Sequence, residues 1–571
     1  MTNPETTPEL LYTLQRELSG KRALLIDRYP NARTSLRTIL AAQGIGSVDN
    51  ASTSVEVLRL VRRHHFDLIV SDYRLEDGLD GQQLLEELRQ QQLVPRSTVF
   101  LMITSERTYH NVVSVAELAP DDYLIKPFTT GELQARLARA LHRKRFFAPV
   151  FERMDSGLEA DALAACERLI GQDSGFLFDA LRIKGELLNA LGRHAEAQIV
   201  YQQVLTQRPL PWAAMGLGIA LQGQQKLAEA ESVGQSLVDS HPQFVAAYDF
   251  LAEVREELGK LPEAQQILQR AAEISPNNAT RLRMVGDVAA RNRDLPVAEK
   301  AYGKVLERRR NSSLRNIDDY TNLARVMLER GHTAGARLVT DGLRRDWHSN
   351  RHGELAALVM ESLCASQEGE HAKAKRAAER AILQQDALKA EGMAGMISER
   401  LALDLAHACL ATGDAENARA IVRKVAAENH EDRALIDQVQ NLYTRVGKED
   451  EGRALLAQVG REIVELNNRG VLAARRGDVE GSVKLLVEAA ERIPNLQFLV
   501  NATKAIFTLL DRRGWDPALA KRGLRFLQQA QAKDARSAKV ASARELFQHV
   551  ARKYGIAEGA TSATPRERSR S

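Results

Sequence analysis

Short apolar runs alternate with amphipathic stretches over the first quarter of the chain. The apolar runs lie at 23–26, 47–51, 68–71, 99–103 and 123–125. Between them, apolar residues recur every three or four positions, which predicts helices over about 31–43, 53–64, 82–91, 109–118 and 131–143. This βα alternation predicts a five-stranded, doubly wound parallel sheet with right-handed crossovers.

One of these runs ends directly on a carboxylate. Leu68, Ile69 and Val70 form a continuous apolar segment that is typical of a strand buried on both faces of a parallel sheet. Asp72 follows at the carboxyl end, the edge at which open α/β sheets place their ligands. This carboxylate is the candidate around which the domain is organised.

Three other polar residues are predicted to share that edge. Asp27 and Thr104 each end an apolar run, and Lys126 follows the fifth. A carboxylate can attack a phosphoryl group and carry it as an acyl phosphate. Mg²⁺ and a lysine can neutralise the transferred charge, and a hydroxyl can hydrogen-bond to the new oxygens. The set therefore predicts a phosphoryl-transfer pocket.

The motifs around these residues match a known family. They are Leu-Leu-Ile-Asp27, Ser-Asp72-Tyr-Arg-Leu, Asp80-Gly81, Thr104-Ser105 and Asp122-Tyr-Leu-Ile-Lys126-Pro127-Phe. On them, residues 21–145 resemble the receiver (CheY-like) domain of bacterial two-component response regulators. The resemblance implies that Asp72 is the phosphoacceptor of a phosphorelay and that its donor is a histidine kinase.

The resemblance also assigns the other site residues. It implies that Thr104 is the switch hydroxyl, that Tyr123 is the rotating aromatic side chain, and that Lys126 contacts the phosphoryl group. Asp27, Asp72 and the backbone carbonyl of Arg74 would hold Mg²⁺. Lys126–Pro127 would be a cis peptide bond.

The chain departs from the family at position 28. Receivers usually carry two adjacent acids after the first strand, and this sequence reads Asp27-Arg28. Arginine stays protonated and cannot ligate a cation, so the Mg²⁺ site is in doubt. Either Arg28 turns outward and leaves a weakened metal site, or its guanidinium pairs with Asp72 and replaces the charge of the metal.

Residues 146–555 show a different periodicity. A glycine is followed five positions later by a small residue at 157/162, 192/197, 259/264, 331/336, 369/374, 413/418 and 477/482. Pro209, Pro242 and Pro276 recur at 33 and 34 residues in phase with these pairs, and Tyr201 and Tyr302 fill a bulky position four residues after the small one. Glycine permits the turn between two helices, the small residues allow close approach, and proline ends the second helix.

This pattern resembles the tetratricopeptide repeat. It predicts an α-solenoid of roughly nine helix pairs, joined to the first domain by a stiff connection because no Gly/Ser linker intervenes. Such an array offers a groove for an unknown protein or peptide. The candidate groove residues are Arg182, Glu186, Trp212, Asp249 and Glu253.

Composition narrows the remaining possibilities. The net charge is +4, from 79 basic and 75 acidic side chains, too small for a sequence-wide nucleic-acid footprint. No apolar run is long enough to span a membrane and the first residues do not resemble a signal peptide, so a cytoplasmic protein is expected. Cys166, Cys364 and Cys409 have no paired spacing and are expected to be buried thiols.

The sequence thus predicts four segments: a lead-in helix (1–20), a receiver (21–145), the repeat array (146–555) and a disordered tail (556–571). No catalytic chemistry beyond phosphoacceptance is expected, so the chain is not predicted to be an enzyme. Two hypotheses follow. One is a response regulator that signals through protein contacts of its array. The other is a phosphorylation-independent scaffold or inhibitor that docks a kinase, which Arg28 keeps open. A DNA-binding regulator is not favoured.

Overall fold

The computed structural model describes residues 15–76, 81–105, 120–172, 175–276, 278–309, 315–393, 397–534 and 537–555. The chain divides into two compact units, Met1–Arg315 and Asn316–Ser571. Each unit is described by itself.

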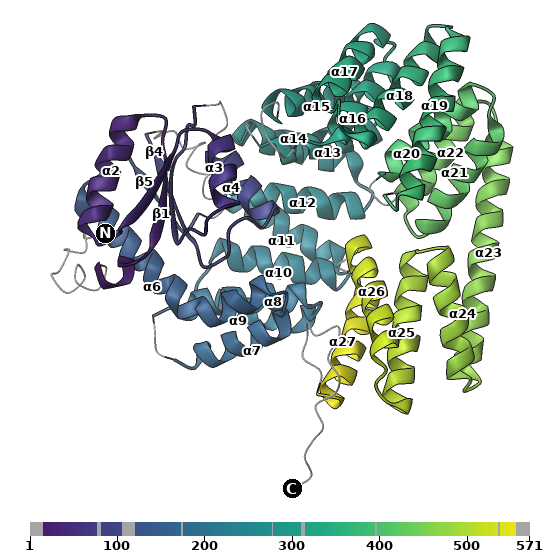
Figure 1. Cartoon of the computed structure of the whole chain (residues 1–571). Coiled ribbons are helices and arrows are strands. Elements are labelled where there is room, and N and C mark those ends of the chain that lie inside the picture. Colours follow the sequence, from purple (N-terminus) through teal and green to yellow (C-terminus); the bar gives the residue numbers. More distant parts are fainter. Residues whose placement is uncertain are drawn as a thin grey trace. The chain divides into compact units, whose positions relative to one another are not determined.

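The first unit begins with a parallel sheet in the strand order β2-β1-β3-β4-β5. The strands are β1 (Arg22–Ile26), β2 (Ser47–Ala51), β3 (Leu68–Asp72), β4 (Val99–Thr104) and β5 (Asp122–Ile125). All neighbouring pairs are parallel, which confirms the predicted doubly wound sheet. Every residue of β3 is buried, as expected for the central strand. Figure 1 shows the sheet with helices on both of its faces.

Helices cover the sheet on both faces. They are α2 (Pro30–Ala42), α3 (Ser54–Val61), α4 (Gly81–Gln90) and α6 (Thr130–Asp155). The predicted helix over 109–118 lies outside the described residues. Of the predicted lead-in helix, Leu18 packs into the core between the sheet and α2 and is fully buried. Leu10, Leu11 and Leu14 lie outside the described residues.

One helix belongs to both parts of the first unit. α6 is 26 residues long and begins at a capping box between Thr129 and Glu132. Its first half contributes Leu133 and Leu137 to the core under the sheet. Its second half contributes Phe147 and Val150 to the core of the following helices. The predicted boundary at 145/146 therefore lies inside a continuous helix.

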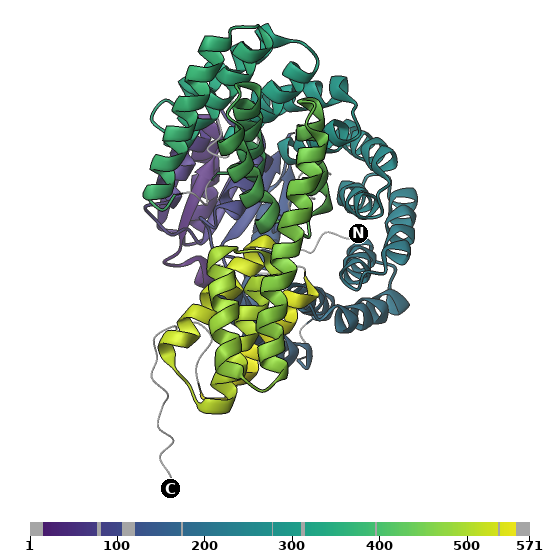
Figure 2. The same cartoon turned by 90° about the vertical axis from the view of Figure 1, so that its right-hand side faces the viewer.

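Antiparallel helix pairs follow in both units, and Figure 2 shows those of the first unit on a curved path. In the first unit the helices are α7 (Glu159–Ile170), α8 (Leu177–Ala190), α9 (His194–Gln207), α10 (Pro211–Gly223), α11 (Leu227–Ser240), α12 (Val245–Glu257), α13 (Leu261–Ile274), α14 (Ala279–Arg291) and α15 (Leu295–Arg309).

The second unit continues the helical pattern. Its helices are α16 (Ile317–Glu329), α17 (Thr333–Asp346), α18 (Arg351–Gln367), α19 (His371–Ala390), α20 (Glu399–Ala411), α21 (Ala415–Glu428), α22 (Arg433–Arg445), α23 (Glu449–Arg475), α24 (Val479–Arg492), α25 (Leu496–Arg513), α26 (Pro517–Lys533) and α27 (Ala538–Lys553). α23 is 27 residues long and runs without interruption.

The repeat signals act as the sequence predicts. Gly192 and Gly259 take φ angles of 75° and 76°, the left-handed conformation that ends the first helix of a pair. A Cβ atom on Gly185 would lie 2.4 Å from the Tyr201 ring, so the small residue is what lets the bulky one fit between helices. No helix among the described residues is long and apolar enough to cross a bilayer.

Candidate functional site

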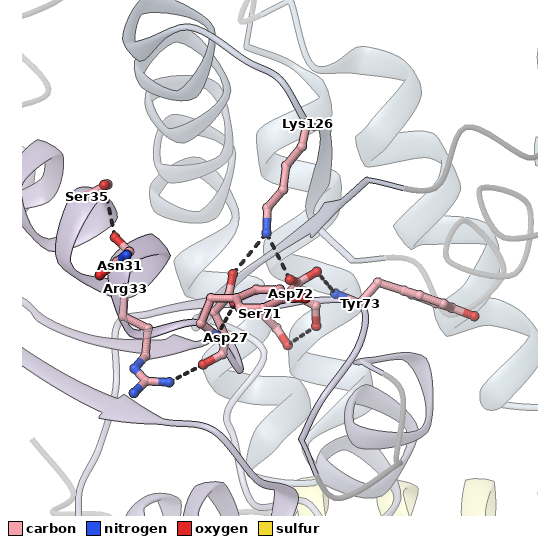
Figure 3. Close-up of polar contacts among 9 residues, drawn as sticks. Asp27, Asn31, Arg33, Ser35, Ser71, Asp72, Tyr73 and Lys126 are labelled. Carbon is pink, nitrogen blue, oxygen red and sulfur yellow. Dashed lines mark hydrogen bonds and ion pairs between the residues drawn. The ribbon is translucent and has the colours of Figure 1, made fainter.

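The carboxyl edge of the sheet brings two carboxylates and an ammonium group together. Asp27 follows β1, Asp72 ends β3, and these neighbouring strands pair in parallel. The Nζ atom of Lys126, just after β5, lies 2.9 Å from Oδ2 of Asp27 and 2.9 Å from Oδ2 of Asp72 (Figure 3). The predicted convergence of three residues from distant parts of the chain is present.

Backbone groups fix the orientation of both carboxylates. The Tyr29 amide donates to Oδ1 of Asp27 at 2.8 Å, and the Tyr73 amide donates to Oδ1 of Asp72 at 2.7 Å. The Arg33 guanidinium, on α2, donates to the Asp27 carbonyl (Figure 3). Sequence reasoning did not identify Arg33, because its contact is with a backbone oxygen rather than with a side chain of the motif.

Burial dominates the electrostatics of Asp72. Burial raises the pKa of Asp72, the Lys126 ammonium opposes that rise, and the neighbouring Asp27 carboxylate adds to it, so the net pKa lies above the ordinary value. Burial alone would lower the pKa of Lys126, but its contacts with Asp72 and Asp27 outweigh burial and raise it. Lys126 is therefore held as a cation, and its single positive charge faces the carboxyl groups of both Asp27 and Asp72.

Thr104 and Tyr123 lie on the two strands beyond Asp72. Thr104 ends β4 and is 2% exposed, and its carbonyl accepts a hydrogen bond from the Lys126 amide at 2.7 Å. Tyr123 is half-buried and packs against the core on the α3–α4 side of the sheet. Lys126–Pro127 is a cis peptide bond, as the resemblance implied.

The structure gives Arg28 the outward position. Its side chain is exposed, and the guanidinium lies 4.6 Å from the centre of the Tyr29 ring. In the described part of the chain the ion pair of Asp72 is with Lys126, and none joins it to Arg28. Of the two alternatives, this geometry matches the one in which Arg28 leaves the pocket.

The donor set can be compared with what a divalent cation needs. Asp27 and Asp72 point to the same place, and carboxylates are the ligands that Mg²⁺ prefers. Arg74 lies two residues beyond Asp72, with an exposed side chain. Within the described residues no cluster of three acidic, histidine or cysteine side chains forms a metal-binding group. The pocket therefore offers a divalent cation two converging carboxylates, those of Asp27 and Asp72.

Gly81 lies against the backbone that follows the pocket. A Cβ atom at this position would lie 2.8 Å from the Asp72 carbonyl and 2.7 Å from the Met102 sulfur. Its amide donates to the Tyr73 carbonyl at 2.6 Å, which holds the start of α4 against the loop after Asp72. Asp80, the other half of this motif, lies outside the described residues.

The candidate groove residues separate into two groups. Arg182 pairs with Glu186 at 2.9 Å and lies 5.9 Å from the Trp212 ring. Asp249 instead forms a two-point ion pair with Arg281, a buried residue that sequence reasoning missed. Asp249 thus joins α12 to α14, and Glu253 is half-buried on α12.

Comparison with known proteins agrees with this geometry. A family model described as the response regulator receiver domain matches residues 23–138, and one described as the tetratricopeptide repeat matches 245–278. The chain is 31% identical to the alkaline phosphatase synthesis transcriptional regulatory protein PhoP of Bacillus subtilis over 180 residues, 31% of this chain and 73% of that protein. The chain belongs to the response regulator family.

Two other relatives of this response regulator show how far the likeness extends. It is 35% identical to the probable transcriptional regulator ycf27 of Cyanidium caldarium over 21% of this chain and 46% of that protein. It is 25% identical to chemotaxis protein CheY-3 of Vibrio cholerae over 21% of this chain and 92% of that protein. The chain thus spans about half the length of the first of these relatives.

Proposed function

We propose that this response regulator accepts a phosphoryl group on Asp72 from a histidine kinase and signals through protein contacts of its helical array. The observation that supports this most directly is the single ammonium of Lys126 held 2.9 Å from both Asp27 and Asp72. A cation in that position neutralises a phosphoryl group as it arrives on the carboxylate. The role is that of a phosphoacceptor rather than of an enzyme with turnover of its own, in the cytoplasm.

The chemistry assigns one step to each residue. Oδ2 of Asp72 attacks phosphorus, the phosphorus–nitrogen bond of the donor phosphohistidine breaks, and its electrons remain on the imidazole, which takes up a proton. Lys126 contacts an oxygen of the transferred group, and the Thr104 hydroxyl donates to another. Tyr123 then moves into the space that Thr104 leaves.

Mg²⁺ belongs to this proposal as the partner of the two carboxylates. Asp27, Asp72 and the Arg74 carbonyl would hold it, and when bound it supplies positive charge to the transferred phosphoryl group. Arg28 stands where the family usually has a further acid, so we expect weak affinity. Half-maximal labelling should need millimolar Mg²⁺.

The direct test is labelling by acetyl phosphate with Mg²⁺, followed on a phosphate-affinity gel. Wild type and Asp49→Ala should be labelled, and Asp72→Ala should not. Asp49 is a suitable control because it is a carboxylate of the same sheet that pairs with Arg22 on β1, away from the pocket. Equal labelling of Asp72→Ala and wild type would exclude Asp72.

Arg28 supports a second candidate function, a scaffold that docks a kinase without being phosphorylated. The variant Arg28→Asp restores the acid and separates the two. If wild type is a phosphoacceptor, Arg28→Asp should raise the labelling rate only a few-fold and lower the Mg²⁺ requirement. A wild type that is not labelled, beside an Arg28→Asp variant that is, would favour the scaffold.

The partner of the array is identified best with the whole chain as bait. A fragment that begins at 152 would cut α6 within its last turn and remove Phe147 from the core that it shares with α7 and α8. Full-length wild type, with and without acetyl phosphate, should retain a partner whose binding weakens in Arg182→Ala but not in Arg193→Ala. Arg193 pairs with Glu196 on α9, outside the candidate groove, and is the matched control.

A further inference from the structure

A buried lysine on α6 ties the sheet to the helical array at the edge opposite Asp72. The Nζ atom of Lys144 lies 2.8 Å from Oδ1 of Asp121 and donates to the Arg96 carbonyl at 2.5 Å. It also lies 5.3 Å from the centre of the Phe151 ring. The Lys144 side chain is 9% exposed and that of Asp121 is 6% exposed, so the pair is sheltered from water.

Asp121 in turn holds the start of two strands. Its Oδ2 accepts the Phe100 amide of β4 at 2.8 Å, and its own amide donates to the Phe100 carbonyl at 2.9 Å. One carboxylate therefore connects β4, the start of β5 and α6. The array is bound to the same point, because Arg143 lies 3.9 Å from Asp121 and 2.9 Å from Asp179 on α8.

A further contact closes the cluster at the far end of α6. The Arg96 amide, just before β4, donates to Oδ2 of Asp155 at 2.9 Å. The helix is thus attached to the sheet both at Lys144 and at its last residue. Aromatic rings of Phe146, Phe147 and Phe176 pack together beside the cluster and attach the same stretch of α6 to the start of α8.

β4 and β5 both run from the Asp121 contact at one edge of the sheet to the Asp72 pocket at the other. Each strand carries a switch residue, Thr104 or Tyr123, and each is held by Asp121 at its amino end. A buried ion pair resists separation, because removing one partner leaves an uncompensated charge. A displacement of β4 and β5 must therefore be followed by α6 or be opposed by it.

We propose that Asp121 and Lys144 form a latch through which the state of the Asp72 pocket sets the packing of α7 and α8. The latch extends the proposed function, and its response to phosphorylation rests on that function. Lys144 and Asp121 are positioning residues in this account, since neither touches the phosphoryl group. The latch makes the array respond to the receiver through a shared helix rather than through a flexible linker.

The test is hydrogen exchange of the full-length protein, with and without acetyl phosphate and Mg²⁺, and labelling of Asp72 measured in the same samples. In wild type, labelling should change the exchange rates of α7 and α8 several-fold. Lys144→Met and Asp121→Asn should keep the labelling and lose that change. Arg145→Met, on the same helix but with an exposed side chain that pairs with Glu17 rather than with Asp121, should behave as wild type.

The double variant Asp121→Asn/Lys144→Met separates coupling from stability. It leaves no unpaired buried charge, so it should unfold closer to wild type than either single variant does, yet its α7–α8 exchange should still not respond. A double variant, or a Lys144→Met variant, that responds as wild type does would overturn the latch.

A second experiment tests the latch without phosphorylation, in case wild type cannot be labelled. Leu25→Ala opens a cavity in the sheet core at a fully buried residue of β1, away from Lys144. It should raise exchange in α7 and α8 when the latch is intact and raise it less when Lys144→Met is also present. An equal rise in both backgrounds would overturn the latch, whereas absent labelling alone would overturn only the proposed phosphorylation. If Leu25→Ala does not fold, the smaller change Val70→Ala on β3 takes its place.

Discussion

The charge balance at Asp72 is unfavourable to the folded receiver. Two buried carboxylates share one ammonium, so the folded protein holds Asp72 with a raised pKa. Asp72→Asn removes the excess negative charge and leaves Lys126 paired with Asp27. We expect the free energy of unfolding to rise by on the order of 1 kcal/mol at pH 7. Urea denaturation measures it, and Asp49→Asn, which breaks an ordinary pair, should not be stabilising.

The same shift predicts a pH dependence of known sign. Because the pKa of Asp72 is higher in the folded state than the ordinary 3.8, the folded state binds more protons just above that pH. The stability contributed by protonated Asp72 is therefore lost as the pH rises through the folded-state pKa. The difference in unfolding free energy between Asp72→Asn and wild type should grow from pH 4 upward and then level off. A difference independent of pH would contradict this electrostatic account.

The residues of the pocket could be predicted from the sequence because each ends a strand or directly follows one, and parallel strands end at one edge. Arg33 and the Tyr29 amide could not, because they act on a carbonyl and a carboxylate through backbone geometry. The Asp121–Lys144 pair was also missed. Its residues are 23 positions apart, and only the packing of α6 against the start of β5 shows that they meet.

Single turn residues are informative at the scale of the helix pair. Gly192, Gln225, Gly259 and Arg293 occupy the same turn in successive pairs and all have positive φ, 62° at both Gln225 and Arg293. A non-glycine residue pays a steric penalty there, about 1–2 kcal/mol. A search for periodic glycines predicts only the pairs that keep glycine. It missed the turns at Gln225 and Arg293 because the conformation is retained while the residue type is not.

The positive φ at these turns predicts opposite changes in stability for two substitutions. Gln225→Gly should raise the free energy of unfolding by up to ~1 kcal/mol, since the side chain is exposed and the strain is relieved. Gly259→Ala should lower it by about 1–2 kcal/mol, because a Cβ there meets no atom within 4 Å and only the backbone conformation is penalised. Thermal denaturation checks both. A stabilising Gly259→Ala would show that the turn does not need glycine.

Close helix packing gives a second prediction for these pairs. A Cβ on Gly216 would lie 2.2 Å from Cζ of Tyr201, whose ring is buried between α8 and α10. Gly216→Ala should therefore lower the free energy of unfolding by about 1–3 kcal/mol. Gly303→Ala, in the middle of α15 with open space around it, should raise it by up to ~1 kcal/mol. If both variants behaved alike, helix propensity rather than packing would govern these sites.

One helix, α6, forms the connection between the receiver and the array. The apolar pattern from Leu133 to Phe151, which only Pro149 interrupts, predicted a direct connection, and α6 provides it. The pattern could not show that the second half of α6 supplies core residues to α7 and α8, because periodicity gives the apolar face of a helix and not its partner. The length of α23 also follows from its sequence. Its sequence contains no proline or left-handed residue between positions 449 and 475 to separate two helices.

Phe147 tests whether the shared helix makes the receiver and the first helix pairs one cooperative body. The residue is fully buried in the core with α7 and α8, and the same helix carries Leu137 in the sheet core. Phe147→Ala should lower the free energy of unfolding by about 3–5 kcal/mol. Because a helix that frays from one core loosens the other, hydrogen exchange should rise in β3 as well as in α8. Leu338→Ala, at a residue of α17 that is 72% exposed, should change stability by no more than about 0.5 kcal/mol. Faster exchange confined to α7 and α8 would mean that the receiver folds independently of the array.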